Sequence, residues 1–154
     1  MSPTLDVLIQ REDFDVALLQ AGLLGGNAEE GAIVAFTGYV RRANCGRVVY
    51  GMQLEHYPGM TESSIHAILA QAAERWPLLA ARVVHRIGTL ATGEHIVWVG
   101  VASMHRAAAY AACEYIMDYL KTEAPFWKKE LADDGEHWVE TRQEDTDRRA
   151  QWQP

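Results

Sequence analysis

The segment from Ser103 to Glu130 constrains the fold more than any other part of the chain. Ser103 is a good helix N-cap, and Thr122 and Pro125 mark the end of a helix, because the residue before a proline avoids the α region. Small and apolar residues recur between these limits at helical spacing: Ala109, Ala112, Cys113, Ile116, Met117 and Leu120. The sequence therefore predicts one long helix that buries a single face.

Five cations gather in this segment: His105, Arg106, Lys121, Lys128 and Lys129. The first two are expected in the first helical turn, Lys121 prolongs the buried stripe, and the last two follow the break. Each lysine alone could be structural, since a lysine in a last turn complements the helix dipole and its stem covers apolar surface. Their density in a chain of net charge −7 predicts a site for a small anionic ligand. The overall acidity argues against nucleic acid or an anionic membrane as the main partner.

The two ends of this predicted helix are too far apart to serve one small ligand. From His105 to Lys121 the chain advances by 16 residues, or roughly 24 Å along a straight helix. If both ends contribute to one site, the second end must come from another copy of the chain. We therefore expect a homodimer with two shared pockets. A further cation, Arg41, ends a glycine-flanked strand, where functional side chains often lie.

The rest of the chain alternates between predicted strands and predicted helices. Runs of β-forming residues predict strands over 5–10, 31–40, 48–57, 81–87, 95–102, 126–131 and 137–141. The 31–40 strand is expected to be buried, the 95–102 strand central, and the last two strands a hairpin across 133–135. Two more helices are expected, one capped by Asp13 and carrying residues as far as Leu24, the other capped by Thr61 and ended by Pro77. Because strands follow one another in pairs, the order favours an α+β fold with a mixed, largely antiparallel sheet.

Residues 1–154 are expected to form a single domain, with 1–30 as an N-terminal strand and helix. The polar tail 142–154 is expected to be disordered unless Trp152 anchors it. No signal peptide or apolar run of transmembrane length is present, so a cytoplasmic location is expected. Cys45 and Cys113 form no metal-binding spacing, and pairing between them stays open.

The histidines show none of the spacings that hold a metal, and neither a metal nor a cofactor is expected. His56, His85 and His95 lie in strand-like segments, where a structural role is favoured. The GxSxG, GxxxxGK and GxGxxG signatures are absent as well. The cations at the ends of the predicted elements are thus the main candidates for function.

Several motifs, taken together, resemble a known family. They are FTGYVR at 36–41, LEHYPGMT at 54–61, HRIG at 85–88, the pair His105-Arg106, and YLKTEAPFWKKE at 119–130. In this order they are similar to the large, catalytic subunit of molybdopterin synthase, the MoaE family. The resemblance extends over about 31–140, and the last motif together with LEHYPGM is highly specific.

The resemblance implies an α/β-hammerhead fold and a sulfurtransferase of molybdenum cofactor biosynthesis. Members convert a cyclic pyranopterin monophosphate, precursor Z, to molybdopterin by installing the two sulfurs of a dithiolene. The sulfur arrives as a thiocarboxylate on the C-terminal Gly-Gly of a small, ubiquitin-like MoaD-type partner. Two large subunits form a central dimer within a heterotetramer. The alternative is a non-catalytic anion-binding or partner-docking module that uses the same cations only to hold a ligand.

By position, the resemblance makes Lys121 and Lys128 the catalytic lysines. It also assigns both lysines to substrate binding, together with Tyr39, Val40, Arg41, His105, Arg106, Lys129 and Glu130. Many relatives have lysine in place of Tyr39, so a backbone contact is expected there. Lys121 lies near the apolar stripe and other cations, and both surroundings should lower its pKa. We hypothesise that it moves protons during sulfur transfer or is transiently acylated by the partner tail.

Overall fold

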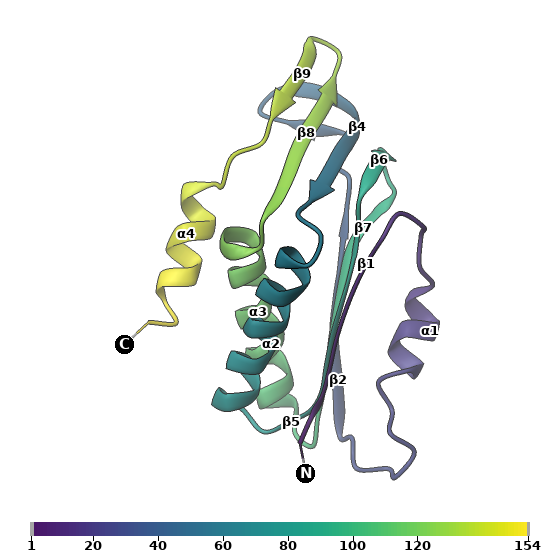
Figure 1. Ribbon diagram of the computed structural model, residues 1–154, viewed down its shortest axis with the longest axis vertical. Coiled ribbons are helices and arrows are strands. Elements are labelled where there is room, and N and C mark those ends of the chain that lie inside the picture. Colours follow the sequence, from purple (N-terminus) through teal and green to yellow (C-terminus); the bar gives the residue numbers. More distant parts are fainter. Residues whose placement is uncertain (1, 154) are drawn as a thin grey trace.

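The computed structural model describes residues 2–153, which form two sheets and four helices (Figure 1). In chain order the elements are β1 (Thr4–Gln10), α1 (Val16–Ala21), β2 (Ala32–Tyr39), β3 (Ala43–Asn44), β4 (Arg47–His56), α2 (Met60–Arg75), β5 (Leu78–Arg86), β6 (Gly88–Ala91), β7 (His95–Ser103), α3 (Arg106–Glu123), β8 (Phe126–Ala132), β9 (Gly135–Trp138) and α4 (Gln143–Ala150). None of the helices within 2–153 is both long and apolar enough to cross a membrane.

The first sheet has the strand order β1-β5-β7-β2, in which only the β1–β5 pair is parallel. Helices α2 and α3 cover one face of this sheet and α1 covers the other (Figure 1). The strand expected to be central, β7, does lie between two others. The expectation that residues 31–40 are buried is wrong, because β2 lies at the sheet edge and leaves Phe36 and Tyr39 exposed.

The second sheet is antiparallel, with the order β3-β4-β8-β9 and with β6 also paired to β4. It extends beyond the ends of α2 and α3 (Figure 1). The expected hairpin of the last two strands is confirmed, and its turn is Asp133-Asp134, since Ala132 pairs with Gly135. The expected α+β fold of hammerhead type, with a mixed and largely antiparallel sheet, is confirmed.

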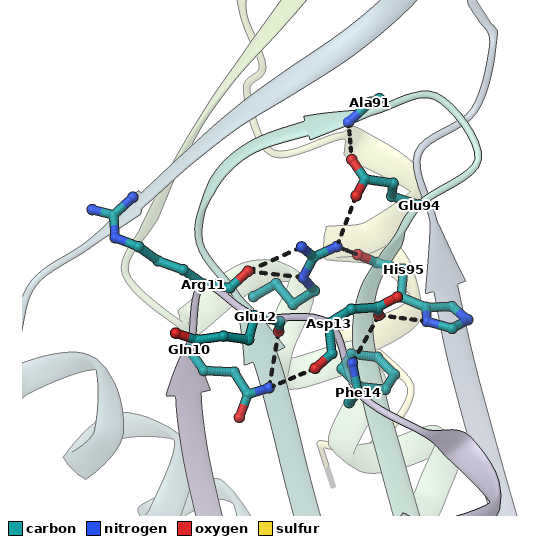
Figure 2. Close-up of polar contacts among 9 residues, drawn as sticks. Gln10, Arg11, Glu12, Asp13, Phe14, Ala91, Glu94 and His95 are labelled. Carbon is teal, nitrogen blue, oxygen red and sulfur yellow. Dashed lines mark hydrogen bonds and ion pairs between the residues drawn. The ribbon is translucent and has the colours of Figure 1, made fainter.

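The first helix is capped by Asp15 and not by Asp13 as expected. The Asp15 carboxylate accepts hydrogen bonds from the backbone N–H groups of Ala17 and Leu18, at 2.9 and 3.2 Å. Asp13 instead lies 2.8 Å from Nδ1 of His95, which holds the chain before α1 against the start of β7 (Figure 2).

Arg86 strengthens the same junction from the end of β5. Its buried guanidinium donates to the backbone carbonyls of Arg11, at 2.9 and 3.1 Å, and of His95, at 3.1 Å. His95, stacked on Phe14 with ring centroids 4.9 Å apart, therefore has the structural role expected of it.

Two other expected caps are also wrong, for a common reason. Ser103 ends β7, where it pairs with both neighbouring strands, and its hydroxyl donates to the Pro77 carbonyl at 2.9 Å. The N-cap of α3 is therefore His105. Thr61 lies inside α2, and its hydroxyl joins that helix to the start of β8 by donating to the Pro125 carbonyl at 3.2 Å. Both hydroxyls serve tertiary contacts in place of helix ends.

Within the polar tail, residues 143–150 form α4 beside α3 (Figure 1). Trp152 anchors it, as the sequence suggested. Its indole N–H donates to Oδ2 of the buried Asp118 at 2.7 Å, and its carbonyl accepts from Arg75 at 3.0 Å. Arg148 adds a 3.1 Å contact to the other oxygen of Asp118. The two cysteines are free: Cys45 is exposed, whereas Cys113 is buried in the α3 stripe.

Candidate functional site

A cavity of about 500 Å³ lies where the end of α3 and β8 meet the edge strand β2. Residues of β2, α3 and β8 form its walls, and the segment leading into α4 closes one side. Among the side chains that line it are Tyr39, Arg41, Lys121, Lys128 and Glu130, all of which the sequence analysis selected. The fold thus brings together residues that are separated by as many as 91 positions, from Tyr39 to Glu130.

Local structure explains why these side chains face one cavity. Lys121 occupies the last turn of α3. Lys128 and Glu130 lie two residues apart on β8, and alternate residues of a strand share a face. Arg41 follows Val40, whose side chain is only 2% exposed and packs with Leu54 and Leu90.

Val40 itself contributes no side chain to the cavity. Its backbone N–H donates to the Glu94 carbonyl at 3.0 Å, and its own carbonyl accepts from Gly93 at 2.8 Å. These contacts fix the chain where β2 ends. Val40 therefore positions its neighbour Arg41 at the cavity.

The surroundings of the two cavity lysines lower the pKa of both. Burial and, to a smaller extent, the nearby charge of Lys121 together lower the pKa of Lys128 to about 8, although Asp145 acts in the opposite direction. Burial likewise lowers the pKa of Lys121, an effect that Asp145 opposes and that Arg41 and Arg142 reinforce. Lys121 is exposed where the cavity opens, yet enough protein surrounds its ammonium for desolvation to dominate. The lowered pKa expected for Lys121 thus has both of the causes proposed for it.

Glu130 is 5% exposed and holds the β3–β4 hairpin against β8. Its Oε2 accepts a 2.7 Å hydrogen bond from the Asn44 amide, and its Oε1 lies 3.7 Å from the Arg47 guanidinium. Tyr39, by contrast, is 52% exposed, and its ring lies 5.0 Å from that of His95. Glu130 is thus an anchor in the cavity wall, and Tyr39 an open aromatic face near the rim.

Besides Val40, three of the predicted residues do not line the cavity of a single chain. Lys129 points to the opposite face of β8, where its ammonium is 3.2 Å from Glu136 and 4.7 Å from the centre of the Trp138 ring. His105 and Arg106 lie at the start of α3, at the other end of the helix from Lys121. Their contribution to the site stays a prediction that requires a second copy of the chain.

Several residues that line the cavity were not predicted from the sequence. Arg142 and Asp145 come from the tail that was expected to be disordered, and Asn44 comes from the β3 hairpin. His85 was assigned a purely structural role, although it also lines the cavity. Its signal in the sequence was the HRIG motif, which the family resemblance included without giving it a function. Within 2–153 no group of three or more His, Cys, Asp or Glu side chains is arranged to hold a metal ion.

Comparison with known proteins identifies the family. A family model described as "MoaE protein" matches residues 9–123, about three quarters of the chain. The chain belongs to the MoaE family. It is 52% identical to the molybdopterin synthase catalytic subunit of Vibrio cholerae serotype O1, over 96% of this chain and 97% of that one. The corresponding subunit of Pseudomonas aeruginosa is 51% identical, over 96% of this chain and 98% of that one.

The fold agrees with this assignment. A solved MoaE protein from Burkholderia ambifaria superposes with a TM-score of 0.81 and 46% identity, and the match covers 97% of both chains. The expectation of a molybdopterin synthase catalytic subunit, and hence of an enzyme, is confirmed. The MoaE family match ends at Glu123, so it includes Arg41 and Lys121 but not β8. The similarity of β8, with Lys128 and Glu130, rests on the relatives that match almost the whole chain.

Proposed function

We propose that the cavity is the active site in which sulfur passes from the C-terminal thiocarboxylate of a small, ubiquitin-like partner to cyclic pyranopterin monophosphate. Two such transfers give the dithiolene of molybdopterin. The observation that carries this proposal is the placement of Lys121, Lys128 and Arg41 in one cavity, with the pKa of both lysines lowered by burial. Binding an anion requires only positive charge, whereas proton transfer near neutral pH requires an amine that can lose its proton.

The chemistry assigns a separate task to each kind of group. Arg41 and Arg142 are permanently charged and suited to the substrate phosphate, which they can bind through charge-assisted hydrogen bonds. The thiocarboxylate sulfur forms a C–S bond to a substrate carbon as a C–O bond of that carbon breaks, and the departing oxygen takes up a proton. Water then cleaves the acyl–sulfur bond, so that the sulfur stays on the substrate and the partner leaves as a carboxylate. Lys128, with a pKa of about 8, can hold and release a proton in these steps. Lys121 at the opening is placed to stabilise the oxyanion that forms on the partner's terminal carbonyl.

The remaining substrate contacts require a second copy of the chain. We propose a homodimer, with one small partner bound to each MoaE subunit, that brings His105 and Arg106 of one subunit to the cavity of the other. The N-terminus of α3 supports this, since its free N–H groups and its dipole favour an anion. Tyr39 would contact the substrate from the rim and Glu130 from the wall, whereas Lys129 would act from outside the cavity. A cytoplasmic location is part of the same proposal.

A reconstituted reaction tests the activity. The chain is mixed with thiocarboxylated partner and precursor Z, and the mass of the pterin product is measured by mass spectrometry. Sulfur transfer predicts a product that carries two new sulfurs and a partner that returns as the carboxylate. A non-catalytic docking module would form the complex and leave the pterin without sulfur, which would contradict the proposal.

A further inference from the structure

A second, more open hollow of about 650 Å³ borders the cavity at the edge strand β2, and no step of the proposed reaction uses it. Thr37 and Tyr39 line both hollows, so the two meet along this strand. The segment 13–17, which leads into α1, and His95 at the start of β7 complete the lining of the second hollow, which we call the rim groove. A flat molecule held in the cavity can therefore extend past Tyr39 into the rim groove.

Tyr39 presents an ordered aromatic ring between the two hollows. A register shift between Gly38 and Tyr39 pairs Tyr39 with His95, and the two rings lie 5.0 Å apart at 55°. His95 in turn stacks on Phe14, with centroids 4.9 Å apart and the planes 13° from parallel. Tyr39 nevertheless remains 52% exposed. Because its ring is already supported by His95, stacking a flat ligand on the open part costs little conformational entropy.

The charged side chains that line the two hollows differ in kind. Four lysine and arginine side chains line the cavity, together with three carboxylates. The rim groove is lined by two carboxylates, Asp13 and Asp15, and none of the described residues in its lining is a lysine or an arginine. A phosphate is therefore favoured in the cavity and disfavoured in the rim groove, whereas a group rich in N–H donors is favoured in the rim groove.

Asp13 supplies a fixed hydrogen-bond acceptor in the rim groove. Its Oδ1 accepts from the backbone N–H of Phe14 and from Nδ1 of His95, both at 2.8 Å (Figure 2). Within residues 2–153 no hydrogen bond uses its Oδ2, and 58% of the side chain is exposed. The hydrogen bond from His95 lowers the pKa of Asp13, so the carboxylate is ionised at neutral pH. Oδ2 can therefore accept from a ligand while Oδ1 keeps the His95 ring in place.

We propose that the rim groove binds the aminopyrimidinone end of the pterin substrate, with Tyr39 stacked on its ring and Asp13 accepting from its 2-amino group, while the phosphate lies in the cavity. The identity of this substrate rests on the proposed function. In a cyclic pyranopterin monophosphate the 2-amino-4-oxo edge and the phosphate lie at opposite ends of one fused ring system. Each end thus meets the hollow whose charges suit it. The carbons that receive sulfur belong to the pyran ring between these ends and then lie in the cavity.

Binding of two free pteridines tests the rim groove without any catalysis. Pterin carries the 2-amino group, and lumazine has a carbonyl in its place. The fluorescence of each is titrated with the full wild-type chain at pH 7. Pterin should bind about tenfold more tightly than lumazine, the effect of one hydrogen bond to a charged acceptor. Failure of the wild-type chain to bind pterin, or equal Kd values for the two compounds, would overturn the proposal.

Asp13→Asn shows whether this preference comes from Asp13. The amide oxygen can still accept from Phe14 and His95, but an NH₂ donor replaces the charged Oδ2. The Kd values of pterin and lumazine should then agree within about threefold, because the variant has lost the acceptor for the 2-amino group. A tenfold preference for pterin that persists in Asp13→Asn would exclude Asp13 as the acceptor and contradict the proposal.

Substitutions at Tyr39 test the stacking contact. Tyr39→Leu keeps an apolar side chain but removes the aromatic face, and it should weaken pterin binding by about tenfold. Tyr39→Phe keeps the ring and should bind pterin within about twofold of the wild-type Kd. Tyr50→Leu is the control, because Tyr50 is 59% exposed on β4 and lines neither hollow. An unchanged Kd in Tyr39→Leu, or equal losses in the Leu and Phe variants, would overturn the stacking role.

The last measurement uses the complex with thiocarboxylated partner and precursor Z. Tyr39→Leu should raise KM for precursor Z by about tenfold and keep kcat within about twofold, because stacking on an unreacting ring is equally strong in the ground state and the transition state. A lower kcat with an unchanged KM would contradict this role. If the wild-type chain transferred no sulfur but bound the free pteridines in the expected order, the proposed function would fail and the pterin site would stand. Sulfur transfer by a chain whose Kd for pterin ignores Tyr39 and Asp13 would leave the function and overturn the site.

Discussion

The side-chain amide of Asn44 donates a 2.7 Å hydrogen bond to Oε2 of Glu130, and this contact joins the β3–β4 hairpin to β8. The hairpin turns through Cys45 and Gly46, which both have positive φ angles, of 51° and 77°. Arg41 lies on the chain that enters this hairpin, just after β2. Holding Asn44 therefore holds the segment that carries Arg41 over the cavity.

Asn44→Ala should loosen this hairpin and weaken substrate binding. The change removes the hydrogen bond to the buried Glu130 carboxylate. Leaving that oxygen without a donor should lower the free energy of unfolding by about 1 to 3 kcal/mol. KM for the pterin substrate should rise more than kcat falls, because Arg41 is less well fixed. Urea unfolding and steady-state kinetics measure the two effects. Cys45→Ser, at the exposed tip of the same hairpin, is the control and should change neither. An Asn44→Ala enzyme with the wild-type KM would refute this role.

Lys121→Ala should abolish dithiolene formation and leave partner binding nearly intact. Lys121 lines the cavity, so its loss removes a charge from the site of reaction but little of the surface between subunits. Arg11→Ala is the control, because Arg11 is an exposed cation that does not line the cavity. The sulfur content of the pterin and the Kd for the partner are measured for both. Wild-type turnover in Lys121→Ala would remove this lysine from the mechanism.

Lys128→Met should make the enzyme more stable and inactive. The unfolded chain keeps the lysine proton up to its ordinary pKa of 10.5, whereas the folded protein releases it near pH 8. Folding therefore expels a proton between these values, and wild-type stability rises with pH in that interval. At pH 7 the variant should gain up to about 3 kcal/mol, and this gain should shrink toward pH 10. Chemical unfolding at each pH measures it, with Lys129→Met as the control. A gain that stays constant from pH 7 to pH 10 would contradict the assignment.

The sequence predicted the main helix well, because the periodicity of α3 is produced by one packed face. All six residues of the predicted stripe are buried or partly buried in the main core. The errors arose where a side chain with a local preference was used for a distant contact. Ser103 has the chemistry of a cap, but it pairs with β2 and β5 and bonds the Pro77 carbonyl. No pattern within a few residues of Ser103 contains that information.

The same limit explains what was missed at the site. The α4 sequence has no apolar stripe, and it is held by Trp152 and by ion pairs to α3, more than twenty residues away in the chain. Its cavity residues Arg142 and Asp145 could not be found from local patterns. His85 lies on a strand whose residues are almost all buried, so alternation could not indicate which of them faces a cavity. Lys121 and Lys128 were identified through the family motif, since composition alone left a structural role open.

Trp152→Ala should release the tail and change the cavity. The indole bonds Asp118 at 2.7 Å and packs edge-on against Trp76 and Tyr115, so truncation removes both a hydrogen bond and apolar contacts. The loss should be about 2 to 3 kcal/mol, below the range for fully buried tryptophans because this one is only partly covered. The rate of amide hydrogen exchange should increase more in α4 than in α2. Trp138→Ala, which removes an exposed tryptophan of β9, is the control. Unchanged α4 protection would show that the ion pairs alone hold the tail.

A mixture of two inactive variants tests whether the site is shared between subunits. Lys121→Ala and His105→Ala each damage one end of α3, and roughly 24 Å of helix separates these ends in a single chain. In a mixed dimer, one cavity receives Lys121 and His105 from different chains and is intact, while the other cavity has neither. Random exchange makes half of the dimers mixed, so activity should return to about a quarter of the wild-type value. The measurement is sulfur transfer after the two purified variants are incubated together. A Lys121→Ala, His105→Ala double variant mixed with wild type provides the control for exchange. Activity that stays at the sum of the separate variants, under conditions where exchange is complete, would place His105 outside the neighbour's cavity.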